Sequence, residues 1–190
     1  MFAQRRKQRL DALVADHGLA MRTFIDRAHA LDASQWLEPR AEGKWTPAQE
    51  TKHVLLSYDE FIRQLRETSP MRPRGTALRR LISRLIGLTS ILWFKRIPVA
   101  VNAPREARPD WVDTPCAELL AALRLRAQEF DAAFARAWRE EPRRRMSHYL
   151  FGKLSLDQAI RVVAVHTRHH AAFLPVKTPG SSSVASAVRS

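Results

Sequence analysis

Three histidines occur within five positions near the C-terminal end of the sequence, in the segment HTRHH at 166–170. Neutral imidazole is the commonest metal ligand among side chains. Two histidines four positions apart on a helix can reach one ion, because one turn rises only about 5.4 Å. His166 and His170 have this spacing. The same pair could instead cap the last carbonyl groups of a helix, so the spacing alone leaves both interpretations open.

The histidines belong to a segment with helical periodicity, which starts at the capping-box sequence SLDQ. At about 100° per residue, His166 falls about 40° from His170, on the apolar stripe of this helix. His169 falls about 100° from His170, on the flank. We therefore expect His166 and His170, but not His169, to face the protein interior.

Two histidines do not complete a metal site, and His53 is the best candidate for a third ligand. It lies about two turns into a helix that begins at WTPAQE, where Thr46 can cap, Pro47 suits the first position and Gln49 completes a capping box. His53 lies away from the apolar stripe of that helix. Periodicity alone favours a solvated face for His53, with a face lining a polar cleft as the alternative. The stripe consists of Val54, Leu55, Tyr58, Phe61, Ile62 and Leu65.

The elements that must position these histidines are helices. Periodicity and start signals predict four, at about 4–31, 46–66, 113–140 and 155–174. A crossover over 76–109 carries a fifth, amphipathic helix in its first half, and EPRRRM at 141–146 is expected to be a solvated run at a helix end. The sequence shows no convincing strand pair. It predicts a single all-α bundle domain over 1–176 and a disordered, small and polar C-terminal tail over 177–190.

The composition limits the classes of function. Lys and Arg total 32 against 19 Asp and Glu, a formal net charge of +13 that favours anionic partners. A single cysteine, Cys116, excludes an intramolecular disulfide and a thiolate metal cluster; it is expected to be a small buried hydrophobe, with a reactive thiolate as the alternative. The N-terminus shows no secretory signal, and the longest apolar stretch has ten residues, about half of a bilayer span. We expect a cytoplasmic protein without a transmembrane segment.

The segments WTPAQETKH, AVNAPREARP, HYLFGKLSLDQ and HTRHHAAFL occur in the order that resembles the DinB/YfiT-like superfamily of metal-dependent enzymes, over most of 8–175. The resemblance implies an antiparallel four-helix bundle with a long crossover. It also implies the metal ligands His53, His166 and His170, and so places His53 in a cleft. The sequence departs from the family at Phe173, where members often have glutamine three residues after the last histidine.

Three neutral imidazoles leave a divalent transition metal with an open position, and suit zinc, nickel or iron. By resemblance, we expect an enzyme that binds a low-molecular-weight thiol there and acts as an S-transferase or isomerase on a small electrophile. A metal-hydroxide hydrolase needs the same histidines and is the alternative. Glu60, two turns beyond His53, is a candidate general base or ligand partner, with a solvated glutamate as the other interpretation. The family also implies a homodimer.

A competing class is a non-enzymatic binding protein. The segment 78–96 mixes Arg79, Arg80 and Arg84 with large apolar residues, a pattern that can lie on an anionic membrane or pack against a protein partner. More often such a helix belongs to a bundle or a dimer, with its charges in water. Nucleic-acid binding is disfavoured, because the positive charge is spread over several segments and no recognised motif occurs.

Overall fold

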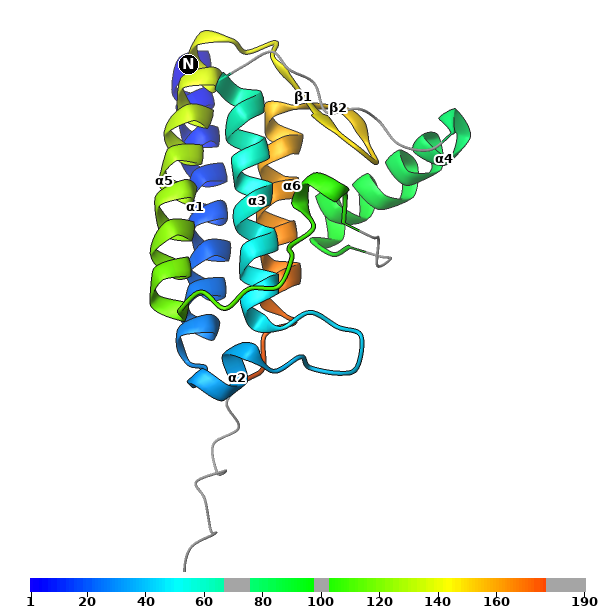
Figure 1. Ribbon diagram of the computed structural model, residues 1–190. Helices are drawn as coiled ribbons and strands as arrows, with labels where there is room; N and C mark the ends of the chain where they lie inside the picture. Colours follow the sequence, from blue (N-terminus) through cyan, green and yellow to red (C-terminus); the bar gives the residue numbers. More distant parts are fainter. Residues whose placement is uncertain (67–75, 98–102, 177–190) are drawn as a thin grey trace, which may run out of the picture.

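The computed structural model describes residues 1–66, 76–97 and 103–176. Four long helices lie side by side (Figure 1). They are α1 (Phe2–His29), α3 (Pro47–Arg66), α5 (Cys116–Glu140) and α6 (Leu156–Ala171). Figure 1 shows α1 and α6 running in one direction and α3 and α5 in the opposite one. The long crossover between α3 and α5 allows these two to be parallel. The predicted four-helix bundle with a long crossover is confirmed.

Side-chain caps fix where α3 and α6 begin. The backbone N–H of Gln49 donates to Thr46 Oγ1 at 3.1 Å, and the Thr46 N–H donates to Gln49 Oε1 at 3.0 Å. Ser155 and Gln158 form the same reciprocal pair at the start of α6. Each box satisfies backbone donors that a helix start leaves without an intrahelical partner. The two helices that carry the histidines therefore start where the sequence predicted.

The core lies between two closely packed helix pairs. α6 packs mainly along α1, and α3 packs mainly along α5. The side chains that fill the space between them are apolar and mostly large, as binary patterning requires. Those with 1% exposure or less include Phe24, Tyr58, Leu120, Leu123, Phe130, Phe134, Ile160 and Val163.

One chain of polar contacts crosses this core. His17 of α1 is fully buried, and its Nε2 lies 2.6 Å from the hydroxyl of Tyr58 on α3. The same hydroxyl lies 3.1 Å from Oγ1 of Thr167 on α6. On the other side of the imidazole, Nδ1 lies 2.8 Å from the carboxylate of Asp131 on α5. Each of the four long helices thus contributes one polar side chain to a connected set.

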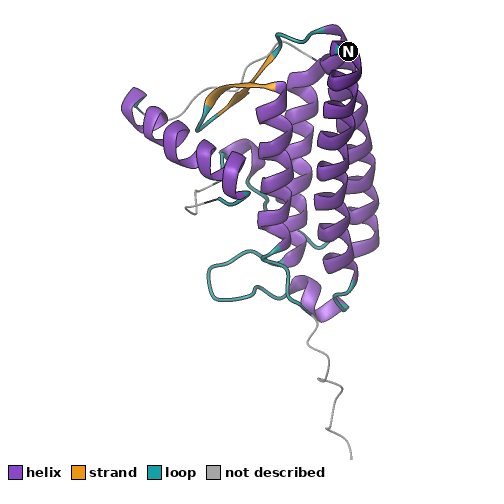
Figure 2. Cartoon of the chain, turned by 180° about the vertical axis from the view of Figure 1, so that it is seen from behind, coloured by secondary structure: helices purple, strands orange, loops and turns teal. Residues whose placement is uncertain are grey.

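The predicted amphipathic helix of the crossover is also present. α4 (Ala77–Ile82) continues through the π-helical turns η1 (Ser83–Leu88) and η2 (Ser90–Phe94), and it projects from the side of the bundle (Figure 2). Arg84 donates to the carbonyls of Phe151 and Lys153, both at 2.9 Å, in the segment that precedes α6. Positions 79 and 80 lie on this helix, but their side chains are outside the described part. Seven described side chains of this helix are large, apolar and exposed: Leu78, Leu81, Ile82, Leu85, Ile86, Trp93 and Phe94.

Within the described residues, no helix combines the length and apolar character that a bilayer crossing requires.

The segment before α6 corrects two sequence-based expectations. β1 (Arg145–His148) and β2 (Gly152–Ser155) form an antiparallel hairpin, in which Met146 pairs with Leu154 and both are buried. Residues 141–146 are therefore not simply a solvated helix end, and a strand pair does exist. Each strand carries only one apolar residue, Met146 or Leu154, so no alternation shows in the sequence. Gly152 follows the turn with a φ of +67°, a conformation that glycine adopts without strain.

Two short helices were also not anticipated, α2 (Ala33–Leu37) and the 3₁₀ turn η3 (Arg105–Ala107). Asp32 caps α2 through a capping box, and Trp36 from this helix is buried against the bundle. The predicted disordered tail, 177–190, lies outside the described residues.

Candidate metal centre

His53 is buried, with 4% of its surface exposed, although the helical wheel of α3 favoured a solvated position. Its Nδ1 lies 2.6 Å from the carbonyl oxygen of Ala107, in η3 of the crossover. A carbonyl only accepts, so Nδ1 must carry the proton and donate. The neutral ring then presents an unprotonated Nε2 on its other side. The crossover backbone thus both covers His53 and fixes its tautomer.

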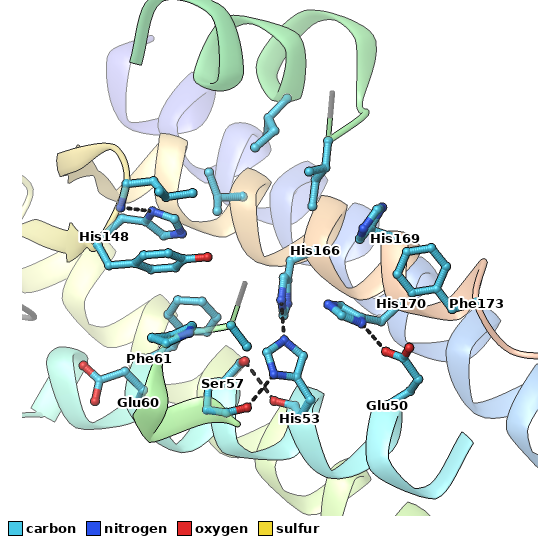
Figure 3. A pocket seen from close by; sticks show the side chains of 18 of the residues that line it. Glu50, His53, Ser57, Glu60, Phe61, His148, His166, His169, His170 and Phe173 are labelled. Carbon is cyan, nitrogen blue, oxygen red and sulfur yellow. Dashed lines mark hydrogen bonds and ion pairs between the residues drawn. The ribbon is translucent and has the colours of Figure 1, made fainter. Parts of the chain in front are cut away.

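The two histidines of α6 meet His53 from the opposite helix. His166 and His170 are one turn apart and point toward His53 (Figure 3). The ring of His53 lies 5.1 Å from that of His166 and 4.5 Å from that of His170, measured between centroids. One ligand nitrogen from each ring falls within 4.8 Å of the other two. As the sequence indicated, His169 lies on the flank and does not belong to this cluster.

His170 is oriented by a buried carboxylate. Its Nδ1 lies 2.6 Å from Glu50 Oε2, and Glu50 is only 4% exposed. An imidazole that donates Nδ1–H to a carboxylate presents its Nε2 to a metal ion, and this arrangement is frequent around zinc. Glu50 lies three residues before His53 and so on the same face of α3.

The cluster fits a divalent metal ion on its own geometry. Nε2 of His166 lies 3.1 Å from Nε2 of His53, close to the about 3.3 Å between ligand nitrogens of tetrahedral zinc. A hydrogen bond between these atoms would place the His166 proton on Nε2. It would leave Nδ1 as a buried acceptor, and this atom has no partner among the described residues. These three histidines could therefore hold a metal through converging nitrogens.

Burial sets the protonation of the centre. It lowers the pKa of His53 and takes the pKa values of His166 and His170 well below the ordinary value, because a charged imidazolium loses its hydration there. Burial also raises the pKa of Glu50 to about 7, against the opposing field of Arg40. The three imidazoles are thus neutral near pH 7, as metal ligation requires.

A fourth histidine, His148 at the end of β1, shares the pocket. Its Nδ1 accepts from the backbone N–H groups of Leu150 and Phe151, at 3.2 and 3.4 Å, so the proton of the neutral ring is on Nε2. Burial lowers the pKa of His148 to about 3. Its ring stacks on that of Phe151 with 4.5 Å between centroids, which fixes it against the hairpin.

We expect the metal-free protein to lose stability as the pH falls from 7 to 5. A buried histidine with a lowered pKa stays neutral when folded, whereas the unfolded chain takes up the proton below about pH 6.5. Each such histidine reduces the free energy of unfolding by up to about 1.4 kcal/mol per pH unit. Glu50 acts in the opposite direction, because its raised pKa lets the folded state take up one proton near pH 7. The four buried histidines outweigh it.

Urea unfolding at pH 7, 6 and 5 measures this effect. The His148→Gln variant should show a shallower loss than the wild type, whereas His29→Gln, which alters an exposed histidine of α1, should leave the slope unchanged. A stability that stays constant between pH 7 and 5 would show that the buried histidines are not neutral.

The histidines open into a pocket of about 220 Å³. The crossover supplies one wall and the β1–β2 hairpin another, and both walls are largely apolar. Phe173, the position at which the sequence departs from the family pattern, lies on the rim beside His169 (Figure 3). The residues of these two walls include Ile91, Ile97, Pro104, Leu150 and Phe151, and Val162 of α6 also lines the pocket.

The carboxylate singled out from the sequence has a different environment. Glu60 lines the same pocket, but its oxygens accept from Arg63 Nη2 at 2.7 Å and from Gln64 Nε2 at 2.9 Å. The structure brings Glu50, not Glu60, to the histidines. Helical spacing places Glu50 on the same face of α3 as His53, but its contact with His170 depends on the packing of α3 against α6.

The Cys116 side chain is half-buried, and its thiol donates to the carbonyl oxygen of Ala28, with 3.6 Å between Sγ and the oxygen. Burial raises its pKa, with Arg124 opposing, so the thiolate is disfavoured. This supports the role of a small packed side chain over that of a nucleophile.

Comparison with known proteins places the chain in a family. A family model described as the DinB superfamily matches residues 19–174. Among solved structures, YfiT from Bacillus subtilis, described as a probable metal-dependent hydrolase with an unusual four-helix bundle topology, is similar with a TM-score of 0.54 and 17% identity, over 87% of this chain and 83% of its own. At that identity the similarity concerns the fold. The search among curated proteins found no match. Since the family model covers most of its length, this chain belongs to the DinB superfamily.

Proposed function

We propose that the chain is a divalent-metal-dependent enzyme that acts on a small molecule, with His53, His166 and His170 as the metal ligands. The supporting observation is the orientation of the rings. Two of the three Nδ1 atoms are held by acceptors, Ala107 and Glu50, so that the opposite nitrogens converge from two helices. Zinc, nickel and iron all suit such a donor set.

We propose hydrolysis as the reaction. A bound divalent ion with an open position lowers the pKa of a coordinated water and polarises a carbonyl. YfiT, similar in fold, is described as a probable metal-dependent hydrolase, which supports this choice over thiol transfer. Thiol-dependent transfer, expected from the family resemblance, needs the same three histidines and is the competing outcome of the test.

The chain's own residues have separate roles in this proposal. Glu50 holds the ring of His170 in position and increases its basicity as a ligand. The Ala107 carbonyl does the same for His53. Apolar side chains of the crossover and the hairpin exclude bulk water from the pocket, which strengthens electrostatic interactions inside it. Glu60 forms an ion pair with Arg63 and has no direct role in metal binding or catalysis in this proposal.

The test uses protein reconstituted separately with zinc, nickel and iron(II). It is incubated with a panel of small esters and amides, and in parallel with an electrophile and a low-molecular-weight thiol. Mass spectrometry identifies the products. Hydrolysis that needs the metal and no thiol would support the proposal; conversion only with thiol would establish transfer instead. No metal-dependent conversion of either kind would reject the enzymatic proposal for these substrate classes.

Two glutamate variants test the role of Glu50. We expect Glu50→Gln to weaken metal binding by about 10- to 100-fold, because the carboxylate orients a ligand. Glu60→Gln, a matched change in the same helix and pocket, should bind metal like the wild type. Competition against a chelating dye measures both affinities. Equal losses in the two variants would contradict the assignment of Glu50.

The binding-protein alternative is not favoured, since the histidines identified from the sequence meet in one pocket. A homodimer or a membrane contact through the exposed apolar face of α4, η1 and η2 stays a prediction.

A further inference from the structure

One arginine stands at the pocket beside the histidines. Arg40 lies in the loop between α2 and α3, and its guanidinium carbon is 4.0 Å above the ring of Phe173. That ring also contacts His170, with 5.7 Å between centroids. A guanidinium over an aromatic face is attracted by the electron-rich ring. The cation is therefore held at the solvent-exposed edge of the pocket that contains the candidate metal centre.

Arg40 forms no ion pair with an acidic side chain of the described residues, although its positive charge acts on the Glu50 carboxylate. None of their hydrogen bonds or ion pairs involves it, although Arg63, Arg126 and Arg168 each bind a carboxylate. It is also the only Lys or Arg among the described side chains that line the pocket. The guanidinium donors are therefore available to a ligand.

The surroundings of Arg40 indicate what kind of ligand this would be. His169 contacts the edge of the Phe173 ring at 4.5 Å between centroids, and its imidazole makes no hydrogen bond within the described part of the chain. A ring N–H of this imidazole can therefore add a donor beside the guanidinium. The walls beyond these groups are mainly apolar, and the two carboxylates among them already have partners, Glu50 with His170 and Glu60 with Arg63. One cation and one imidazole N–H donor at the rim of a largely apolar cavity match a small molecule with a single anionic group.

We propose that the pocket binds small molecules that carry a carboxylate on an apolar body, and that Arg40 recognises the carboxylate. The planar guanidinium can donate two parallel N–H bonds to the two carboxylate oxygens, whereas Phe173 keeps it in place. The inference rests on the proposed function only in taking such a molecule as the substrate. Carboxylate binding by Arg40 itself needs no metal.

The test compares two probes of similar size, 4-fluorophenylacetate and the neutral 2-(4-fluorophenyl)ethanol, by ¹⁹F NMR titration of zinc-loaded protein. We expect the acid to bind about tenfold more tightly than the alcohol, the effect of a charge-assisted bond at a partly solvated site. Arg40→Gln should abolish this preference and Arg40→Lys should keep part of it. Arg143→Gln, which removes one exposed positive charge elsewhere, should retain it fully.

The same titration with His53→Ala, expected to lack the metal, separates the two proposals. A preference for the acid that survives in His53→Ala and disappears in Arg40→Gln supports recognition by Arg40, whether or not the metal proposal holds. A preference lost in His53→Ala but kept in Arg40→Gln shows that the carboxylate binds the metal, and overturns the inference. No preference in the wild type, whether both probes bind or neither does, also overturns it. If inorganic phosphate displaces the probe at lower concentrations than the acid does, the site recognises phosphate rather than carboxylate, and this outcome also contradicts the proposal.

Discussion

Replacing His53, His166 or His170 singly with alanine is expected to reduce bound metal from about one ion per chain to almost none. Two imidazoles are a poor chelate for a divalent ion, and each substitution leaves only two of the three converging nitrogens. The effect should be nearly complete, because no other described side chain lies in position to replace the lost ligand. Any metal-dependent activity should disappear with the metal.

Elemental mass spectrometry measures this on protein purified without a histidine tag and reconstituted with zinc. His29→Ala and His169→Ala are the matched controls, since the first alters an exposed histidine of α1 and the second the immediate neighbour of a ligand. Both should keep the metal. Circular dichroism checks that the variants are folded. A wild type that binds no metal, or triad variants that bind as much as the controls, would contradict the ligand assignment.

The second large effect concerns stability. Phe130 of α5 is fully buried, and its ring packs against those of His17, Tyr58 and Phe134, at 5.1, 5.7 and 5.9 Å between centroids. Phe130→Ala should therefore reduce the free energy of unfolding by about 3 to 5 kcal/mol, from the lost transfer energy and the cavity left behind. For a domain of this size such a loss is a large part of the total.

Urea denaturation of the metal-free protein measures this loss, so that changes in metal binding do not enter. Leu125→Ala is the matched control, because Leu125 lies on the same helix and is 52% exposed. It should cost no more than about 0.5 kcal/mol. A loss below about 1 kcal/mol in Phe130→Ala would mean that the rings around it repack without a cavity.

The parts of the site that depend on one helix were predictable from the sequence. His166 and His170 are four positions apart, and the apolar residues around them identify the inward face of α6. The capping boxes at Thr46 and Ser155 gave the two helix starts. Local rules suffice here, since both the spacing and the cap involve residues within one or two turns.

The environment of His53 could not be predicted in this way. Its face of α3 is polar, and periodicity therefore favoured solvent. In the structure this face is covered by Ala107 and Trp45, whose ring lies 5.0 Å from that of His53. Irregular backbone from a distant part of the chain leaves no periodic signal. The family resemblance placed His53 in the cleft, which residue patterns alone did not.

Glu50 and the hairpin were missed for a related reason. A glutamate in the first turn of a helix is ordinarily explained by the helix dipole. The contact of Glu50 with His170 comes from tertiary packing, which the local sequence does not indicate. The hairpin strands have four residues each and carry one buried apolar residue apiece, which is too little for an alternation pattern.

The polar chain through His17, Tyr58 and Thr167 has a consequence for how the helices are aligned. Apolar surfaces of neighbouring helices can slide past one another with little change in buried area, whereas hydrogen-bond distances tolerate only tenths of an ångström. A one-turn shift of α6 along α3 would separate the Tyr58 and Thr167 hydroxyls by about 5 Å. Thr167 directly follows His166, and Tyr58 follows His53 by five residues. The contacts that prevent the shift therefore also set the relative height at which the histidines of the two helices meet.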